Sequence, residues 1–153
     1  MWLQAQHHEN IGRNHLLELM DKFPDAPWHY SDISRNPNFN MTVLTMFFND
    51  VNSHKWDWYC ISKNKNITWD IVKDNNLPWD WCGLSLNPNI TIDIIQNNNK
   101  TIGNKRGARR CKWQMAYFIR NINANPNLIH NYVTKHKTRH IQDIISNPNI
   151  SWD

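Results

Sequence analysis

Residues that could bind a metal ion or act as a nucleophile are few in this sequence. His136 and His140 have the i,i+4 spacing of metal ligands on one helix face, but no Glu or Cys accompanies them at ligand spacing. The adjacent pair His7 and His8 is equally isolated. Cys111 lies among basic residues, which can make a thiol reactive, yet no His partner accompanies it in a motif. We therefore predict no enzyme activity, no catalytic or metal-binding residue and no cofactor.

Four aspartates recur at equivalent positions of a repeated pattern. Asp57 and Asp80 share one position, and Asp70 and Asp93 share another. A catalytic carboxylate need occur only once, whereas a helix cap recurs with every helix. We therefore interpret all four as structural residues at helix starts.

Charge is distributed unevenly along the chain. Up to residue 99 there are seven Lys and Arg against eleven Asp and Glu, and from residue 100 onward there are ten against two. Clustered cations neutralise phosphates and release counterions, which gives salt-sensitive binding without sequence specificity. The candidate polyanion-binding residues are Lys100, Lys105, Arg106, Arg109, Arg110, Lys112, Lys135, Lys137 and Arg139.

Three interpretations of this polarity stay open. The cations can belong to a solvated loop and a solvated helix face. They can bind nucleic acid or another polyanion, with Trp113 either stacking on a base or anchoring the basic segment to the core. The basic half of one copy can also meet the acidic half of another, head to tail.

An internal repeat accounts for the most distinctive segments. PWHYSDISRNPNFNMTVL (27–44), KWDWYCISKNKNITWDIV (55–72) and PWDWCGLSLNPNITIDII (78–95) align without gaps. We predict a single repeat domain over 1–153. Its copies span about 15–26 (partial), 27–54, 55–77, 78–99, 116–137 and 138–153 (partial), with a basic insertion at 100–115.

Each copy is predicted to form two short helices. The first begins near Pro27 or Pro78, because proline suits the first helical turn, and it ends before Pro88. The second begins after Thr68 or Thr91 as N-cap. Asn40 and Ser151 take the same cap position in two other copies, whereas Ile129 breaks the pattern.

Helices of about eight residues are unstable alone, so the copies must stack to bury their aromatic faces. We predict an all-α fold in which tandem helix pairs form a small α-solenoid. The β-branched residues would also permit strands, but the caps favour helices. The predicted core residues are Trp28, Trp56, Trp58, Trp69, Trp79, Trp81, Ile33, Ile61, Leu84, Ile122 and Ile144.

Asparagines recur in every copy. Asparagine side chains bond nearby backbone groups, so we predict that these residues close the turn between the two helices and bond to the neighbouring copy. The predicted turn asparagines are Asn36, Asn64, Asn87, Asn125 and Asn147, and a second set follows two residues later at Asn38, Asn66, Asn89, Asn127 and Asn149.

The pattern NPNIT-W-D-I-I followed by P-W-D-W resembles the tandem tryptophan-rich repeats of uncharacterised proteins in giant DNA viruses of the mimivirus type. The resemblance is strongest at 55–72 and 78–95 and faint beyond Thr101. It implies a viral protein expressed in an infected protist host, and it transfers no site residues. The chain departs from the pattern in its basic insertion, in Tyr117 and Arg139 at tryptophan positions, and in its end at Asp153.

We therefore expect a non-enzymatic protein–protein interaction protein, or a self-assembling structural protein, of a giant virus. The alternative is nucleic-acid or polyanion binding through the basic C-terminal half. The start of the chain lacks the apolar core of a signal peptide, and no stretch of about 18 apolar residues suits a membrane span. The three cysteines lack CxxC spacing. We expect the host cytoplasm or the virion, with no secretion and no membrane.

Overall fold

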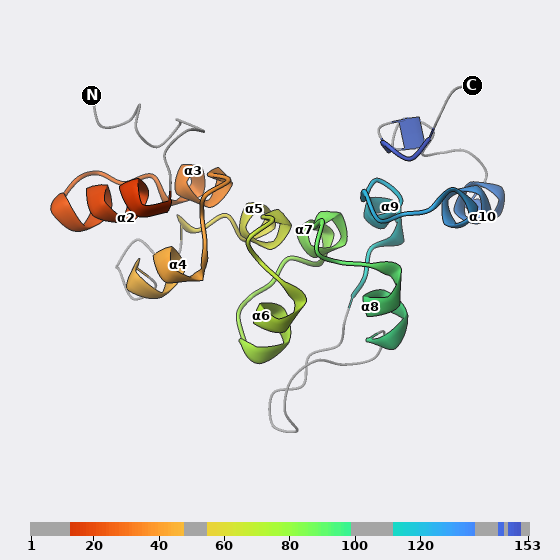
Figure 1. Cartoon of the computed structure of the whole chain (residues 1–153), viewed down its shortest axis with the longest axis horizontal. Helices are drawn as coiled ribbons and strands as arrows, with labels where there is room; N and C mark the ends of the chain where they lie inside the picture. Colours follow the sequence, from red (N-terminus) through yellow and green to blue (C-terminus); the bar gives the residue numbers. More distant parts are fainter. Residues whose placement is uncertain (1–12, 48–54, 99–111, 137–143, 146, 151–153) are drawn as a thin grey trace.

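The computed structural model describes residues 13–47, 55–98, 112–136, 144–145 and 147–150, and all regular structure in these ranges is helical (Figure 1). The all-α prediction is confirmed for this part of the chain. The helices are α2 (Arg13–Lys22), α3 (Tyr30–Arg35), α4 (Met41–Phe47), α5 (Trp58–Lys63), α6 (Trp69–Asp74), α7 (Trp81–Leu86), α8 (Ile92–Asn97), α9 (Met115–Phe118) and α10 (Pro126–His136). Within the same ranges, none of the helices has the length and apolar composition needed to cross a membrane.

The helices follow an arch in two rows (Figure 1). We call α3, α5, α7 and α9 the inner row, because they lie along the inside of the arch and each contacts the next. The outer row consists of α2, α4, α6, α8 and α10, which follow the outside of the arch. The chain alternates between the rows, so each inner helix is followed by an outer one.

The inner helices start later than the sequence predicted. α3 begins at Tyr30 and α7 at Trp81, three residues after the prolines that were expected to open them. Before α7, the N–H of Trp79 donates to the carbonyl of Leu77 (2.8 Å), so this stretch is a tight turn and not helix. The proline therefore belongs to the connection between helices.

Side-chain caps explain the actual helix starts. Asp57 and Asp80 accept the backbone N–H of the residue three positions ahead, at 3.0 and 2.7 Å, and so cap α5 and α7. Thr68 and Thr91 cap α6 and α8 in the same way, as predicted. The predicted cap Asn40 accepts the N–H groups of two residues in the first turn of α4. The predicted cap Ser151 lies outside the described residues.

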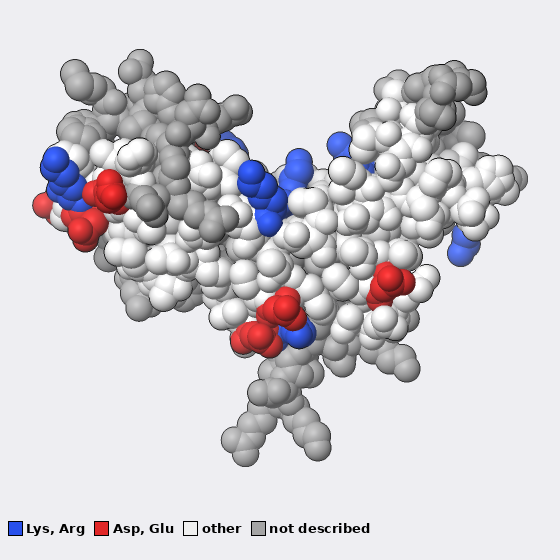
Figure 2. All heavy atoms as spheres, in the orientation of Figure 1, with Lys and Arg blue, Asp and Glu red and all other residues white. Residues whose placement is uncertain are grey.

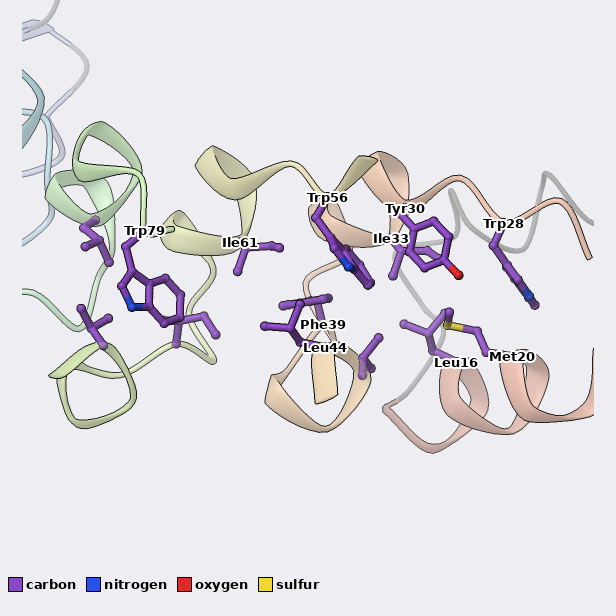
Figure 3. Close-up of a cluster of buried hydrophobic side chains, with 14 residues drawn as sticks. Leu16, Met20, Trp28, Tyr30, Ile33, Phe39, Leu44, Trp56, Ile61 and Trp79 are labelled. Atoms are coloured by element: carbon purple, nitrogen blue, oxygen red, sulfur yellow. The ribbon is translucent and has the colours of Figure 1, made fainter. Parts of the chain in front are cut away.

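The apolar core lies between the two rows (Figure 3). Leu16 and Met20 of α2 and Leu44 of α4 face Ile33 of α3 and Ile61 of α5. A second cluster continues the core from Ile90 to Ile129. Helices this short have little stability alone, so burial between the rows must supply most of it.

The fourth turn lies in a different register from the predicted one. Asn121 accepts the N–H of Asn123 (2.9 Å) and thereby occupies the turn position that was assigned to Asn125. Asn125 instead caps α10 by accepting the N–H of Leu128 (2.8 Å). The Asn-Pro-Asn at 125–127 resembles the turn motif, but the structural turn reads Asn-Ile-Asn at 121–123. Asn127 lies within α10.

This register also corrects two further expectations. Trp113 takes the position equivalent to Trp79, so the tryptophan of this copy is not replaced by Tyr117. Ile122, predicted in the core, is 56% exposed, because it follows the turn asparagine and lies on the outside of the turn.

Candidate functional site

Five turns that end the inner-row segments share one local hydrogen bond. In each turn, an asparagine Oδ1 accepts the backbone N–H of the residue two positions ahead, at 2.8 to 2.9 Å. This is the Asx-turn geometry that asparagine favours. The asparagines are Asn36, Asn64, Asn87, Asn121 and Asn147, and all are buried.

The amide groups of these asparagines join each turn to the one before it. Asn64 Nδ2 donates to the carbonyl of Asn36 (2.9 Å), and Asn87 Nδ2 donates to the carbonyl of Asn64 (2.9 Å). Asn121 and Asn147 continue the series at 2.8 and 2.9 Å. We call this series the asparagine ladder. The side-chain amides of the ladder donate hydrogen bonds to buried backbone carbonyls of the turns, which lie outside helices and sheets.

The asparagines two residues later form a parallel series of bonds. Asn66 Nδ2 donates to the carbonyls of Pro37 and Phe39 at 2.8 and 3.0 Å. The equivalent amides of Asn89, Asn123 and Asn149 bond to the preceding turn in the same way. Each turn is therefore held to its predecessor by two side-chain amides.

Buried serines make a third connection between inner helices. Ser62 Oγ accepts the N–H of Asp80 (2.9 Å), which is the N-cap residue of the next inner helix. Ser34 and Ser85 accept the N–H groups of Asp57 and Gln114 in the same way, at 3.1 and 3.0 Å. All three serine side chains are buried.

Close approach of α5 and α7 depends on a glycine. A Cβ at Gly83 would lie 2.4 Å from the carbonyl oxygen of Tyr59 and 2.9 Å from the Cβ of Ser62. Contacts this short do not occur in stable packing, so only glycine suits this position.

The first polar bond of the ladder is missing. Asn36 Nδ2 is buried and finds no hydrogen-bond partner within the described residues. Its equivalents all donate to a preceding turn, and Asn36 belongs to the first turn of the described series. A buried amide without an acceptor destabilises the fold locally by about 1–3 kcal/mol.

The predicted core tryptophans fall into two groups. Trp28, Trp56 and Trp79, which precede the inner helices, are buried. Trp58, Trp69 and Trp81 are partly buried against the same core. Trp56 packs edge-on against Tyr30 (4.7 Å between ring centroids), and Trp79 packs edge-on against Trp58 (5.8 Å). Trp56 and Trp79 therefore each contact an aromatic ring of the preceding inner helix.

Trp113 follows the same pattern. Its ring packs edge-on against Trp81 at 5.0 Å and lies 5.5 Å from Trp69. Its indole N–H donates to the carbonyl of Asn98 (3.1 Å), as that of Trp79 donates to Asn75 (3.1 Å). Of the two roles considered for Trp113, this geometry matches the anchor and leaves base stacking without support.

The other predicted core residues have mixed positions. Ile33, Ile61 and Leu84 are fully buried, whereas Ile144 is partly buried.

Few of the candidate polyanion-binding residues lie in the described part of the chain. Lys112 and Lys135 are exposed. Seven others lie outside the described residues, namely Lys100, Lys105, Arg106, Arg109, Arg110, Lys137 and Arg139.

Sequence reasoning missed an exposed set on the inner row. Arg35, Lys63 and Arg120 each directly precede a ladder asparagine, and all three are exposed. Tyr59 is also exposed, at 36%. The sequence could have indicated this set, because a basic residue recurs directly before the turn asparagine. The wrong register of the fourth turn hid Arg120 from that comparison.

One electrostatic cluster links α3 to α5. Arg35 donates to Asp57 Oδ2 (3.2 Å) and Asp32 Oδ1 (3.4 Å). Burial acts to raise the pKa of Asp57, but hydrogen bonds from Cys60 and Arg35 outweigh it and lower the pKa overall. Burial, followed by the neighbouring Asp57, raises the pKa of the Cys60 thiol. This thiol is therefore less reactive than an ordinary cysteine.

No cluster of side chains suited to metal binding is present in the part of the chain that the structure describes. No group of three or more His, Cys, Asp or Glu residues there is placed to hold an ion. A hollow of about 330 Å³ lies beside the connection from α2 to α3, lined in part by Pro24, Trp28, Tyr30 and Lys55. His29 and Ser31 also line this hollow. We searched family models, curated proteins and solved structures for similarity to this chain, and no match was found.

Proposed function

We propose that this chain is a small α-solenoid of tandem helix-pair repeats that acts as a non-enzymatic protein–protein interaction module. The proposed setting is a giant DNA virus with tryptophan-rich repeat proteins, in the host cytoplasm or in the virion. The partner is a viral or host protein, or a second copy of this chain in a self-assembling structure.

The asparagine ladder is the observation that carries this proposal. Buried amides join consecutive turns from Asn36 to Asn147 in one register. A row joined in this way is stiff along its length and keeps the surface residues of successive helix pairs in fixed order. Surfaces ordered in this way suit recognition of an extended partner.

The test uses the full chain. Light scattering across protein concentration measures self-association. Affinity capture from infected cells, with the same matrix carrying a heat-unfolded sample as control, measures binding to other proteins. A chain that stays monomeric excludes the self-assembling form. A chain that is monomeric and also captures nothing above the control contradicts the proposal.

A second candidate is polyanion binding through the basic half. It is supported by the excess of cations from residue 100 onward and by exposed Lys112 and Lys135. Fluorescence anisotropy with labelled DNA and RNA across salt concentration tests it. Replacing both Arg109 and Arg110 with Ala should make the affinity for nucleic acid depend less steeply on salt, because fewer counterions are released. Absence of binding at low salt would exclude this candidate.

A further inference from the structure

The ladder aligns a column of residues on the inner row. Because each turn asparagine bonds to the preceding one, the residues directly before them are also in register along the row. These residues are Arg35, Lys63, Leu86 and Arg120. Three of the four are exposed cations, and Leu86 is partly buried.

Two phenols lie beside this column. Tyr59 precedes Lys63 by four residues on α5, and Tyr117 precedes Arg120 by three, so each phenol shares a surface with its cation. Burial raises the pKa of Tyr59, while the charge of Arg120 opposes that shift and Tyr117 adds to it. Side chains from α5 and from the end of α9 therefore lie close enough to influence one another across α7.

The exposed carboxylates lie outside the inner row, whereas the inner row carries partly buried carboxylates, two of which, Asp32 and Asp57, pair with Arg35. The carboxylates of Asp57 and Asp80 on the inner row cap helices and are partly buried. The exposed carboxylates of Asp70, Asp74 and Asp93 belong to the outer helices α6 and α8. Figure 2 shows the molecule hollowed on the inner side, with Lys and Arg side chains over α5, Asp and Glu side chains over α8, and side chains of both signs together over α6.

We infer that an acidic, extended segment of a partner protein binds along the inner face, which we define as the exposed side chains of Arg35, Tyr59, Lys63 and Arg120 together with the partly buried Tyr117. This inference rests on the proposed protein-interaction function and adds to it the binding face and the partner's chemistry. Tyrosine and arginine are the residues most enriched in the energetic centres of protein interfaces. The inside of a curved helix row provides the continuous surface that an extended chain needs.

The composition favours a protein over a nucleic acid. The cations occupy three of the four turn positions and are mixed with phenols and with the exposed side chain of Ile122. A nucleic acid carries a charge at every phosphate and is matched by a dense basic stripe. An acidic segment that also carries apolar side chains matches the mixed inner face.

The test selects binders from a displayed library of random 16-residue peptides on the intact chain. Lys63→Glu with Arg120→Glu serves as the loss-of-binding variant, because both side chains are exposed and outside the core. Lys22→Glu with Lys73→Glu, on the outer helices α2 and α6, is the outer-row control, because it reverses the same number of exposed cations. Circular dichroism and thermal midpoints verify that all variants fold.

Selected peptides should be rich in Asp and Glu, and their affinity should fall at least tenfold in the Lys63 and Arg120 variant and less than twofold in the outer-row control. Uncharged or basic selected peptides, or equal losses in both variants, would overturn the inference. A labelled 12-nucleotide single strand that binds more tightly than the peptides, and loses binding only in the Lys63 and Arg120 variant, would also overturn it. If affinity capture yields a partner that binds the Lys63 and Arg120 variant as tightly as the unmodified chain, the inference about the inner face is wrong, while the proposed interaction function stands.

Discussion

Replacing the central ladder asparagine measures directly how much the turns stabilise one another. Asn87 is fully buried. Its Oδ1 accepts the N–H of Asn89 at 2.8 Å, and its Nδ2 lies 2.8, 2.9 and 3.0 Å from the carbonyls of Ser62, Asn64 and Ile67. Since an amide has two hydrogens, the side chain makes roughly three full hydrogen bonds at a time.

At about 1 kcal/mol net for each hydrogen bond, Asn87→Ala should lower the free energy of unfolding by about 3 kcal/mol. For a chain of this size that corresponds to a fall in Tm of roughly 6–12 °C. Urea denaturation followed by tryptophan fluorescence, together with calorimetry, measures both quantities. Asn76→Ala is the control, because Asn76 is exposed between α6 and α7 and its loss should change stability by less than about 0.5 kcal/mol.

A second substitution at the same position separates the two roles of the side chain. Asn87→Asp keeps the oxygen that closes the turn but replaces the donating amide with a carboxylate oxygen that faces three carbonyls. It should therefore destabilise the chain at least as much as Asn87→Ala. If the urea midpoint of Asn87→Asp equalled that of the unmodified chain, the bonds between turns would contribute nothing and the reasoning would be refuted.

Three further changes test other contacts. Gly83→Ala should destabilise by about 1–3 kcal/mol, because its Cβ would lie 2.4 Å from the Tyr59 carbonyl; a higher urea midpoint, as expected from helix propensity alone, would contradict this. Asp80→Ala should lose about 1 kcal/mol of capping in the same assay, and an unchanged midpoint would contradict the capping role. The lowered pKa of Asp57 stabilises the folded chain above the ordinary value of 3.8, and this stabilisation disappears as pH falls through the folded pKa. The stability difference between the unmodified chain and Asp57→Asn should therefore shrink below about pH 3.8 in urea titrations, and a constant difference would refute it.

The wrong register of the fourth turn shows a limit of motif matching. The letters Asn-Pro-Asn occur at 125–127, yet the turn forms at Asn121 and Asn123. Proline at 126 suits the first residue of α10, with Asn125 as its cap. Either register satisfies the local preferences of asparagine and proline. The choice depends on which one places Trp113 against Trp81 and the turn amide against the preceding turn.

The sequence analysis missed the exposed inner face for a related reason. Linear counting divided the charge into an acidic and a basic half of the chain. In the structure, charged residues that are close in sequence belong to different rows, since Lys63 ends an inner helix and Asp70 begins an outer one. Residues a few positions apart in the sequence therefore lie on opposite sides of the molecule.

Local features were determined by the sequence by itself. Helical class, the caps at Thr68 and Thr91, and the turn-closing role of Asn64 and Asn87 all depend on side chains that bond backbone within a few residues. The register of the fourth turn, the need for glycine at position 83 and the exposure of Ile122 were decided only by the tertiary structure. These features depend on which carbonyl, ring or helix of the preceding pair lies opposite, and a contact between residues that are 20 or more positions apart leaves no local pattern to read.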